Sequence, residues 1–237
     1  NYALLPQISA NAHYRFSNLF EIDAKQVFSR FIHPKKNQTQ GYRHRLDYTL
    51  SWGTETLRGF FKPSFKLSYL GYSLSEGNTL DRDPSVTAPS FSLDAGIFLE
   101  RKGIMTSKLT QTLEPRIFYV KRAFKDQSQL PDFDTELSQP TYDLLFQDNR
   151  FIGDDRLSDL DRLSLAVTSR LIEEKSGREI LSASIAHAVH FTPPLTNLHK
   201  SALENELNRF ESNDSLLALK VSSTLNPNWR INTNVIY

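Results

Sequence analysis

The sequence contains no cysteine among its 237 residues. Disulfide bonds, thiolate metal ligands and cysteine nucleophiles are therefore excluded within this chain. It also lacks any apolar run close to the roughly 18 residues of a membrane-spanning helix, so no such helix is predicted. The formal net charge is only +1, and hence no strong electrostatic field favours nucleic acid as a partner.

Signatures of catalysis are also missing from the sequence. It has no G-x-S-x-G nucleophile elbow, no phosphate-binding loop, no G-x-G-x-x-G and no H-E-x-x-H. His187 and His190 come nearest to a ligand pair, but on a strand their rings would point to opposite faces, and no third ligand is evident. We therefore predict no enzyme, no metal site and no cofactor.

The dominant pattern that is present is alternation with a period of two residues, which is typical of β-strands. Between residues 45 and 52, for example, Leu46, Tyr48, Leu50 and Trp52 alternate with Arg45, Asp47, Thr49 and Ser51. The pattern predicts ten strands, near residues 2–16, 19–33, 42–54, 58–74, 90–102, 105–124, 160–173, 178–192, 214–226 and 229–237.

The connections between these strands alternate strictly between short and long. The long ones are predicted at residues 34–41, 75–89, 125–159 and 193–213. Such a meander is typical of an outer-membrane barrel, where periplasmic turns are short and extracellular loops are long. Large aromatic residues near the strand ends fit an interfacial girdle; they are Tyr14, Phe16, Phe20, Trp52, Phe60, Phe61, Tyr72, Phe124, Phe191 and Trp229.

A soluble all-β sandwich would also alternate, but its strands average only about five or six residues. Strand length and loop asymmetry favour the membrane protein. We predict an all-β fold: an antiparallel up-and-down transmembrane β-barrel segment, with about ten strands of a larger barrel in a single domain over residues 1–237. Because the sequence begins at Asn1 without methionine and finishes within a strand, we expect an internal piece of a longer chain.

The longest connection, about residues 125–159, is rich in aspartate. One interpretation is an acidic loop that binds divalent cations or repels stray lipid. The interpretation that we prefer is an ordered loop, folded into or over the barrel lumen, that satisfies its charges internally, with Arg150 and Arg156 pairing to aspartates. A short helix is also predicted inside the last long loop, because Ser201-Ala202-Leu203-Glu204 has the pattern of a capping box.

Glu114-Pro115-Arg116 interrupts a predicted strand. Proline cannot donate a hydrogen bond to the sheet, so it marks a bulge or kink. Glu114 and Arg116 lie two residues apart and share one face, which we expect to be the lumen. They would contact a lumenal partner or passing lipid, or form part of an internal salt-bridge network; we favour the network.

Several motifs in residues 105–192 are specific to one family. The stretches T-Q-T-L-E-P-R (110–116), D-Q-S-x-L-P-x-F-D-T (126–135), L-F-x-D-N-R-F-x-G-x-D-R (145–156) and T-S-R (168–170) occur in this order. Their order and spacing resemble the LptD (OstA) family of outer-membrane proteins that assemble lipopolysaccharide.

The resemblance implies a large barrel in the outer membrane of a Gram-negative bacterium that inserts lipopolysaccharide into the outer leaflet. It also implies two partners, an LptE-like lipoprotein plug in the lumen and a periplasmic lipopolysaccharide-transport bridge that reaches the barrel through an N-terminal domain absent from this sequence. A general porin or uptake barrel is the alternative function, and a soluble β-rich binding module is a further one. The predicted lumen and loop network consists of Glu114, Arg116, Asp126, Gln127, Asp134, Arg150, Asp155 and Arg156.

Overall fold

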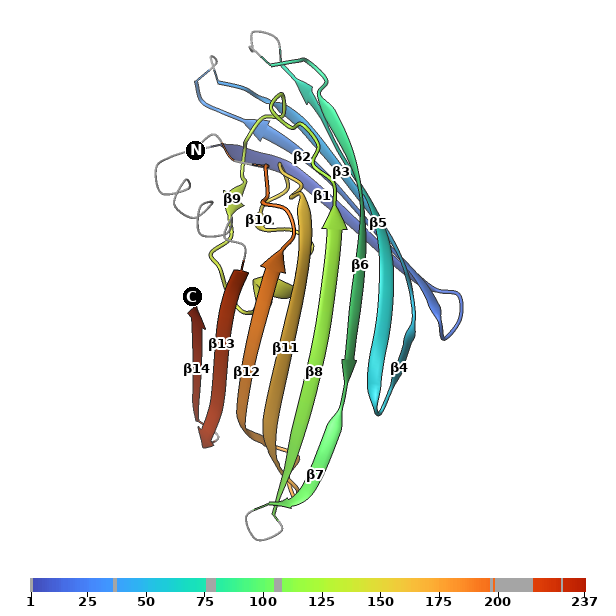
Figure 1. Ribbon diagram of the computed structural model, residues 1–237. Helices are drawn as coiled ribbons and strands as arrows, with labels where there is room; N and C mark the ends of the chain where they lie inside the picture. Colours follow the sequence, from blue (N-terminus) through green and yellow to red (C-terminus); the bar gives the residue numbers. More distant parts are fainter. Residues whose placement is uncertain are drawn as a thin grey trace.

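A computed structural model describes residues 2–35, 38–75, 80–104, 108–196, 198, 215–226 and 228–237. These residues form one curved sheet in which each long strand pairs antiparallel with the next (Figure 1). The long strands are β1 (Ala3–Arg15), β2 (Phe20–Ile32), β3 (Gly41–Trp52), β5 (Gly59–Leu74), β6 (Ser85–Ile97), β8 (Leu109–Arg122), β11 (Leu160–Glu173), β12 (Glu179–His190), β13 (Ser215–Asn226) and β14 (Trp229–Ile236). The predicted all-β antiparallel meander is thereby confirmed.

Two strands differ from the prediction. The strand predicted at 90–102 begins earlier, at Ser85, and is interrupted after Ile97; the chain continues as β7 (Leu99–Ile104), which pairs with β8. In the same way, β4 (Thr54–Thr56) follows β3 after Gly53 and pairs with β5. β4 thus extends the hairpin of β3 and β5, and β7 extends the hairpin of β6 and β8. The helix predicted at Ser201–Glu204 lies outside the described residues.

The two ends of the sheet differ in their connections. The short turns lie at one end, which we call the turn end, and the long connections lie at the opposite, loop end (Figure 1). The order β1 to β14 leaves these two strands as the edges of the sheet, so the described strands do not close a barrel. No helix in the described part of the chain has the length and hydrophobicity that a bilayer crossing requires.

The two faces of the sheet differ from those of a soluble protein, because the buried face is polar and the exposed face is apolar. Along β3, Arg43, Arg45 and Asp47 are buried on the concave inner face, whereas Tyr48 and Leu50 are exposed on the convex outer face. Alternation along the strand separates these groups, since successive side chains point to opposite faces. Soluble sheets instead bury the apolar set.

Most of the predicted girdle residues fit this arrangement. Exposed aromatic side chains gather at the turn end; they include Tyr14, Phe16, Phe20, Trp52, Phe61 and Trp229. Two predicted members were assigned wrongly. Tyr72 is buried on the inner face, and Phe60 lies on that face too, because both occupy even positions of β5, as do the buried Ser68 and Leu70.

Candidate functional site

The connection between β8 and β11, residues 123–159, lies against the concave face of the sheet (Figure 1). We call it the inward loop. It contains a two-stranded sheet of β9 (Glu136–Leu137) and β10 (Phe151–Ile152), and a 3-10 helix, η1 (Asp143–Phe146). None of these three elements is evident in the sequence, because each is shorter than the window over which periodicity can be recognised.

Apolar side chains anchor the inward loop at two places. Phe133 stacks on Phe31 of β2, with ring centroids 4.4 Å apart, and Leu130 and Leu157 join the same buried cluster. Farther along, Tyr142 and Leu145 pack on a row of small residues; these are Ala166, Ala186, Ala188 and Ala218 of β11, β12 and β13. Small side chains on the inner face leave room for the loop to approach the strands closely.

Beside the first anchor, Asp155 is the centre of a buried polar node, since its partners Tyr72 and Phe133 belong to that cluster. Its Oδ1 accepts hydrogen bonds from Arg43 Nη1 and Tyr72 Oη, each at 2.7 Å. Its Oδ2 accepts from the backbone N–H groups of Phe133 and Asp134, both at 2.8 Å. Arg43 also binds Asp134 through Nη1 and Nη2, at 2.5 and 2.9 Å. One arginine of the sheet thus holds two carboxylates of the loop.

This arrangement shifts the pKa values of the two carboxyl groups in opposite directions. Burial raises the pKa of Asp155, but the charge of Arg43 and the hydrogen bonds from Asp134 N–H and Tyr72 outweigh it, so the pKa lies below its usual range. For Asp134, burial and the neighbouring charge of Asp155 outweigh the bond from Arg43 and raise the pKa. Asp155 is therefore the anion on which the node depends.

Further cations of the sheet meet other carboxylates of the inward loop. Asp148 receives Lys66 Nζ at 2.9 Å and Arg122 Nη2 at 3.2 Å. Burial alone would raise the pKa of Asp148. The positive charges of Lys66 and Arg122 together have the larger effect, so the pKa lies below its usual value. At the far side, Lys220 Nζ lies 2.7 Å from Asp143. The acidic composition of the loop thus complements basic residues of the sheet.

Two predicted network residues, Arg156 and Arg150, donate hydrogen bonds to backbone carbonyl groups. Arg156 donates to the carbonyl oxygens of Pro131, Asp155 and Leu130 at 2.7, 2.9 and 3.1 Å. Arg150 donates to the carbonyl oxygen of Thr196. The expected pairing of Arg156 with aspartate carboxylates was wrong, since its described hydrogen bonds all end on carbonyl oxygens.

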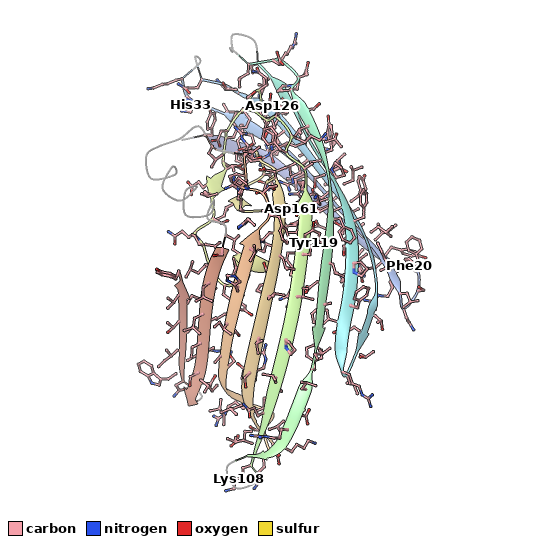
Figure 2. All side chains as sticks on the ribbon, viewed as in Figure 1. Phe20, His33, Lys108, Tyr119, Asp126 and Asp161 are labelled. Carbon is pink, nitrogen blue, oxygen red and sulfur yellow. The ribbon has the colours of Figure 1, made fainter. Side chains whose placement is uncertain are left out.

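Gln127 bridges the start and the finish of the inward loop. Its side-chain amide donates to Leu157 O at 2.8 Å and accepts from Leu157 N at 2.9 Å. Asp126, in contrast, lies at the surface of the loop end (Figure 2). It accepts a local bond from Ser128 N–H at 2.9 Å, and that bond lowers the pKa of its carboxyl group. Asp126 is therefore outside the node.

The remaining predicted residues, Glu114 and Arg116, line a cavity of about 490 Å³ next to η1 on the inner face. They do not pair with one another. Arg116 binds Asp94 at 2.8 and 2.6 Å, and Glu114 accepts from Arg170 Nε at 3.0 Å. We call this space the inner cavity; its wall continues over polar residues of β11 to β14, among them Thr168, Ser182, Ser184, Ser222 and Asn232.

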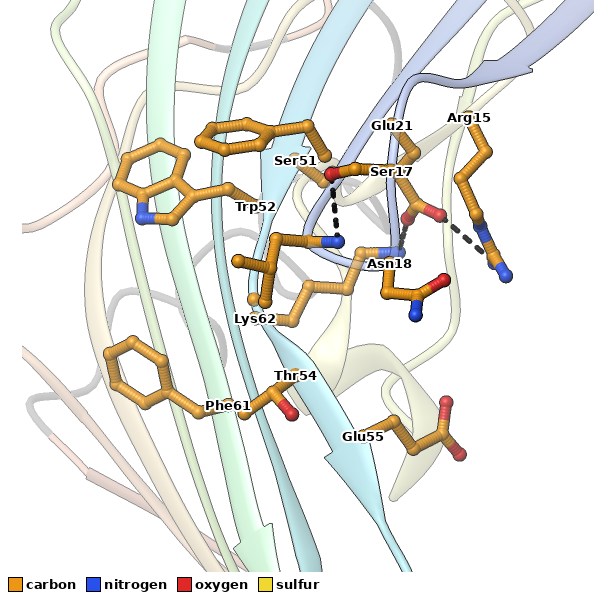
Figure 3. Close-up of a pocket in the computed structure, with 13 residues that line it drawn as sticks. Arg15, Ser17, Asn18, Glu21, Ser51, Trp52, Thr54, Glu55, Phe61 and Lys62 are labelled. Atoms are coloured by element: carbon orange, nitrogen blue, oxygen red, sulfur yellow. Dashed lines mark hydrogen bonds and ion pairs between the residues drawn. The ribbon is translucent and has the colours of Figure 1, made fainter.

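A second cavity, of about 570 Å³, lies at the turn end beside the β1–β2 turn (Figure 3). Its main polar feature is Glu21, which forms ion pairs with Lys62 and, at 3.4 Å, with Arg15. Trp52 and Phe61 border it. Glu21 is thus already paired, and Arg15, Lys62 and Glu55 are exposed, so these charges do not form a buried ligand site.

Neither cavity has the composition of a catalytic centre. Ser and Thr side chains are present, but in the described part of the inner cavity no histidine contacts them. His190 is buried on the inner face and His187 is exposed on the outer face, as their spacing predicts. Within the described residues, no group of three or more His, Asp or Glu is placed to hold a metal ion.

The sequence singled out the loop residues of the network together with Glu114 and Arg116 of β8, but missed their partners on the sheet. Arg43, Tyr72, Lys66, Arg122 and Arg170 complete the interactions of the predicted residues. The sequence contained a signal for Arg43 and Lys66, because each lies at a polar position of a strand in which polar and apolar residues alternate. Their partners could not be identified because they lie 82 or more residues away.

Comparison with known proteins agrees with the motifs in the sequence. The family model for LptD, described as LPS transport system D, matches residues 1–237. Relatives named LPS-assembly protein LptD include those of Saccharophagus degradans, 34% identical over 254 residues, and Thiobacillus denitrificans, 35% identical over 233 residues. The matches cover 100% and 98% of this chain but only 28% and 31% of the relatives. The chain therefore spans less than a third of the length of either relative.

Proposed function

The chain belongs to the LptD family, and from this membership we propose that it forms part of an outer-membrane barrel that delivers lipopolysaccharide to the outer leaflet. The turn end faces the periplasm and the loop end faces the cell exterior, because outer-membrane barrels have short periplasmic turns. Strands beyond this chain complete the barrel at the edges of β1 and β14, since an unpaired sheet edge is costly in lipid.

The observation that carries this proposal is the reversal of the two faces. The convex face exposes Leu50, Phe65, Leu165, Ile185 and Leu219, which suits contact with acyl chains. The concave face carries charged and hydroxyl groups, which suits a hydrated lumen. A soluble binding module with this outer surface would expose a continuous apolar face far larger than monomeric proteins tolerate.

The function is passage and assembly, with no covalent chemistry. The charges of the inner cavity are compensated within the wall, as in the pairs Glu114–Arg170 and Arg116–Asp94. A wall of compensated charges and hydroxyl groups hydrates a polar head group without holding it tightly. The driving force for transport comes from outside this chain.

The inward loop narrows the lumen at the extracellular side. Its two apolar anchors and the Asp155 node support this role, since they fasten the loop to the wall on both sides of η1. An LptE-like lipoprotein plug would sit against the concave face below the loop, where the inner cavity could receive some of its side chains. The periplasmic transport bridge would engage an N-terminal domain outside this chain.

The proposal is tested in a Gram-negative host whose full-length parent protein can be depleted. On depletion, we expect lipopolysaccharide at the cell surface to fall as cells divide, and re-expression to restore it. In the rescuing copy, a photo-reactive residue at Ser182, in the inner cavity, should cross-link lipopolysaccharide or the lipoprotein plug. The matched position Ile185 on the outer face should not cross-link the lipoprotein plug. Unchanged surface lipopolysaccharide after depletion would refute the proposed function.

The narrowing of the lumen has its own test. Deleting residues 129–145 removes both the β9 strand and part of η1, and cells with this deletion should become more permeable to small hydrophilic dyes. Unchanged permeability in cells that contain normal amounts of the protein would contradict the role of the inward loop.

A further inference from the structure

Polar side chains gather on the outer face of β2, β3, β5 and β6 near the loop end. We call them the outer patch; its members are Gln26, Arg30, His44, Tyr69, Ser85 and Thr87. Gln26, Arg30, Ser85 and Thr87 are exposed, and His44 and Tyr69 are half-buried. The strand register brings them together, because His44 lies opposite Gly71 of β5, and Gly71 lies opposite Ser85 of β6.

The contacts within the outer patch leave hydrogen-bond donors available. Gln26 Nε2 lies 2.9 Å from His44 Nε2, so this one contact uses at most one of the N–H groups that the two side chains carry. The Tyr69 hydroxyl lies over Gly71, only 2.4 Å from the position that a Cβ there would take. The absence of a side chain at Gly71 thus allows the Tyr69 hydroxyl to lie beside His44 on the surface.

Arg30 supplies an uncompensated positive charge. Its guanidinium carbon lies 5.6 Å from the centre of the Tyr42 ring, and among the described residues no carboxylate forms an ion pair with it. The outer-facing positions of β2, β3, β5 and β6 contain no aspartate or glutamate. By contrast, Lys121 on the outer face of β8 is neutralised by Asp161 at 3.0 Å, and Figure 2 shows Asp161 next to Tyr119 on this stretch of the wall.

The height of the outer patch follows from strand geometry. Tyr42 and Trp52 mark the two ends of the exposed aromatic set on β3. Ten residues of strand cover about 33 Å, or about 25 Å along the membrane normal at a typical tilt, which is the height of the apolar band of an outer-membrane barrel. Arg30 pairs with Tyr42 in the register, and so Arg30 lies at the extracellular interface, with the rest of the outer patch reaching from there to the level of Leu46.

Polar groups at such a position need a polar partner, because exposing them to acyl chains is unfavourable. We propose that the outer patch binds the phosphorylated sugar head group of a glycolipid in the outer leaflet, with its acyl chains running toward the turn end past Phe65. Arg30 contacts the phosphate, since a guanidinium and a phosphate form charge-assisted bonds. The hydroxyl and amide groups contact the sugar. This site is on the outer wall, apart from the lumen, and rests on the proposed function only for its orientation in the membrane.

The test uses the purified full-length parent protein in vesicles of phosphatidylcholine that contain diphosphorylated lipid A. Native mass spectrometry of the protein released from the vesicles counts the lipid A molecules retained. Arg30→Gln should reduce retention about tenfold, as expected for the loss of one charge-assisted hydrogen bond. Arg30→Lys should keep part of the retention because it preserves the charge but not the planar fork. Lys121→Gln, which removes a compensated cation on the same face, should leave retention unchanged.

Three results would overturn the assignment. Equal retention by the wild type and Arg30→Gln would show that the patch binds no phosphorylated lipid. If phosphatidylglycerol in such vesicles were retained as well as lipid A, the site would not recognise the sugar. If inorganic phosphate displaced lipid A completely, the site would bind a free anion and not a lipid. Retention requires no transport, so it can be measured even if depletion of the parent protein fails to lower surface lipopolysaccharide.

Discussion

Arg43 on β3 and Asp155 in the inward loop are separated by 112 residues in the sequence, yet Arg43 Nη1 lies 2.7 Å from Asp155 Oδ1. Their side chains are 1% and 0% exposed. A buried pair of this kind contributes little beyond what apolar residues would, but removing one partner leaves an uncompensated charge. The pair therefore determines where the inward loop lies.

We expect Asp155→Asn in the full-length parent to destabilise the inward loop by about 1.5–3 kcal/mol, because the charge-assisted hydrogen bonds to Asp155 are lost while Arg43 keeps Asp134 as a counter-ion. Hydrogen exchange at the amides of Phe133 and Asp134, which donate to Asp155, should become much faster. Asp126→Asn serves as the control, since Asp126 is exposed and its bond is local. Equal exchange in the two variants would contradict the central role of Asp155.

The attachment of the inward loop should depend on pH. The pKa values of Asp155 and Asp148 are lowered in the folded protein, so their contribution is complete above the unfolded pKa of about 3.9. It is lost as the pH falls through the lower folded values. Asp134, whose pKa is raised, acts in the opposite direction and weakens this dependence.

The measurement for this prediction is hydrogen exchange at the amides of Phe133 and Asp134, corrected for the pH dependence of intrinsic exchange. Protection of these amides should fall only below about pH 4. Asp148→Asn should reduce the size of the acid-induced change because it removes one of the two anions. A loop that opens between pH 5 and 7 would contradict the assignment of these shifts.

Gly153 is predicted to be essential for the fold of the inward loop. Its φ is +85°, and a Cβ would lie 2.4 Å from the carbonyl oxygen of Asp134. Gly177 in the β11–β12 turn has φ +68° but open space around it. Gly177→Ala should therefore cost only the left-handed strain of about 1–2 kcal/mol, whereas Gly153→Ala should cost more, because the backbone must also move.

The two glycine variants are compared in the full-length parent in detergent. At each urea concentration, cleavage by a protease within residues 129–152 reports the fraction of open loop. Similar midpoints for loop opening would show that space at Gly153 is not limiting.

The orientation of the two faces is tested by placing a charge on each. Leu165 of β11 is exposed on the outer face, and Leu165→Lys should destabilise the protein in a bilayer by about 2–4 kcal/mol. Ser182→Lys adds the same charge on the inner face, where the inner cavity can hydrate it. The amount of protein assembled in outer-membrane fractions should fall only for Leu165→Lys. A larger loss for Ser182→Lys would reverse our assignment of the faces.

Local patterns accounted for most of the sheet. The alternation along β3, β11 and β12 predicted both the strands and the separation of apolar from ionic faces, because side-chain direction depends only on position along a strand. The start of β6 at Ser85 was missed because Pro89, a residue typical of turns, follows closely. Val86 and Ala88, which are buried on the inner face, were therefore assigned to the preceding loop. Pro89 is tolerated in the strand because its backbone nitrogen faces away from β5, and the pairing of β6 with β8 begins only at Ser90.

Within the candidate site, sequence reasoning succeeded where chemistry was local and failed where it was not. The shared face of Glu114 and Arg116 followed from their spacing, but their partners Arg170 and Asp94 did not. Arg156 was expected to bind carboxylates, as arginines in acidic loops often do. It instead binds three carbonyl groups that the turn of the loop brings to it.

The sequence by itself determined the meander, the alternation of short turns with long loops and the two contrasting faces of the wall. Each follows from the conformation of neighbouring residues. Only the tertiary structure decided that the acidic loop folds inward and that Arg43 meets Asp155. The physical reason is that a charge is compensated by whichever opposite charge lies nearby. The path of the inward loop is set by this pair together with the packing of Phe133 and Leu145 of the loop against distant strands, so no local pattern encodes that partner.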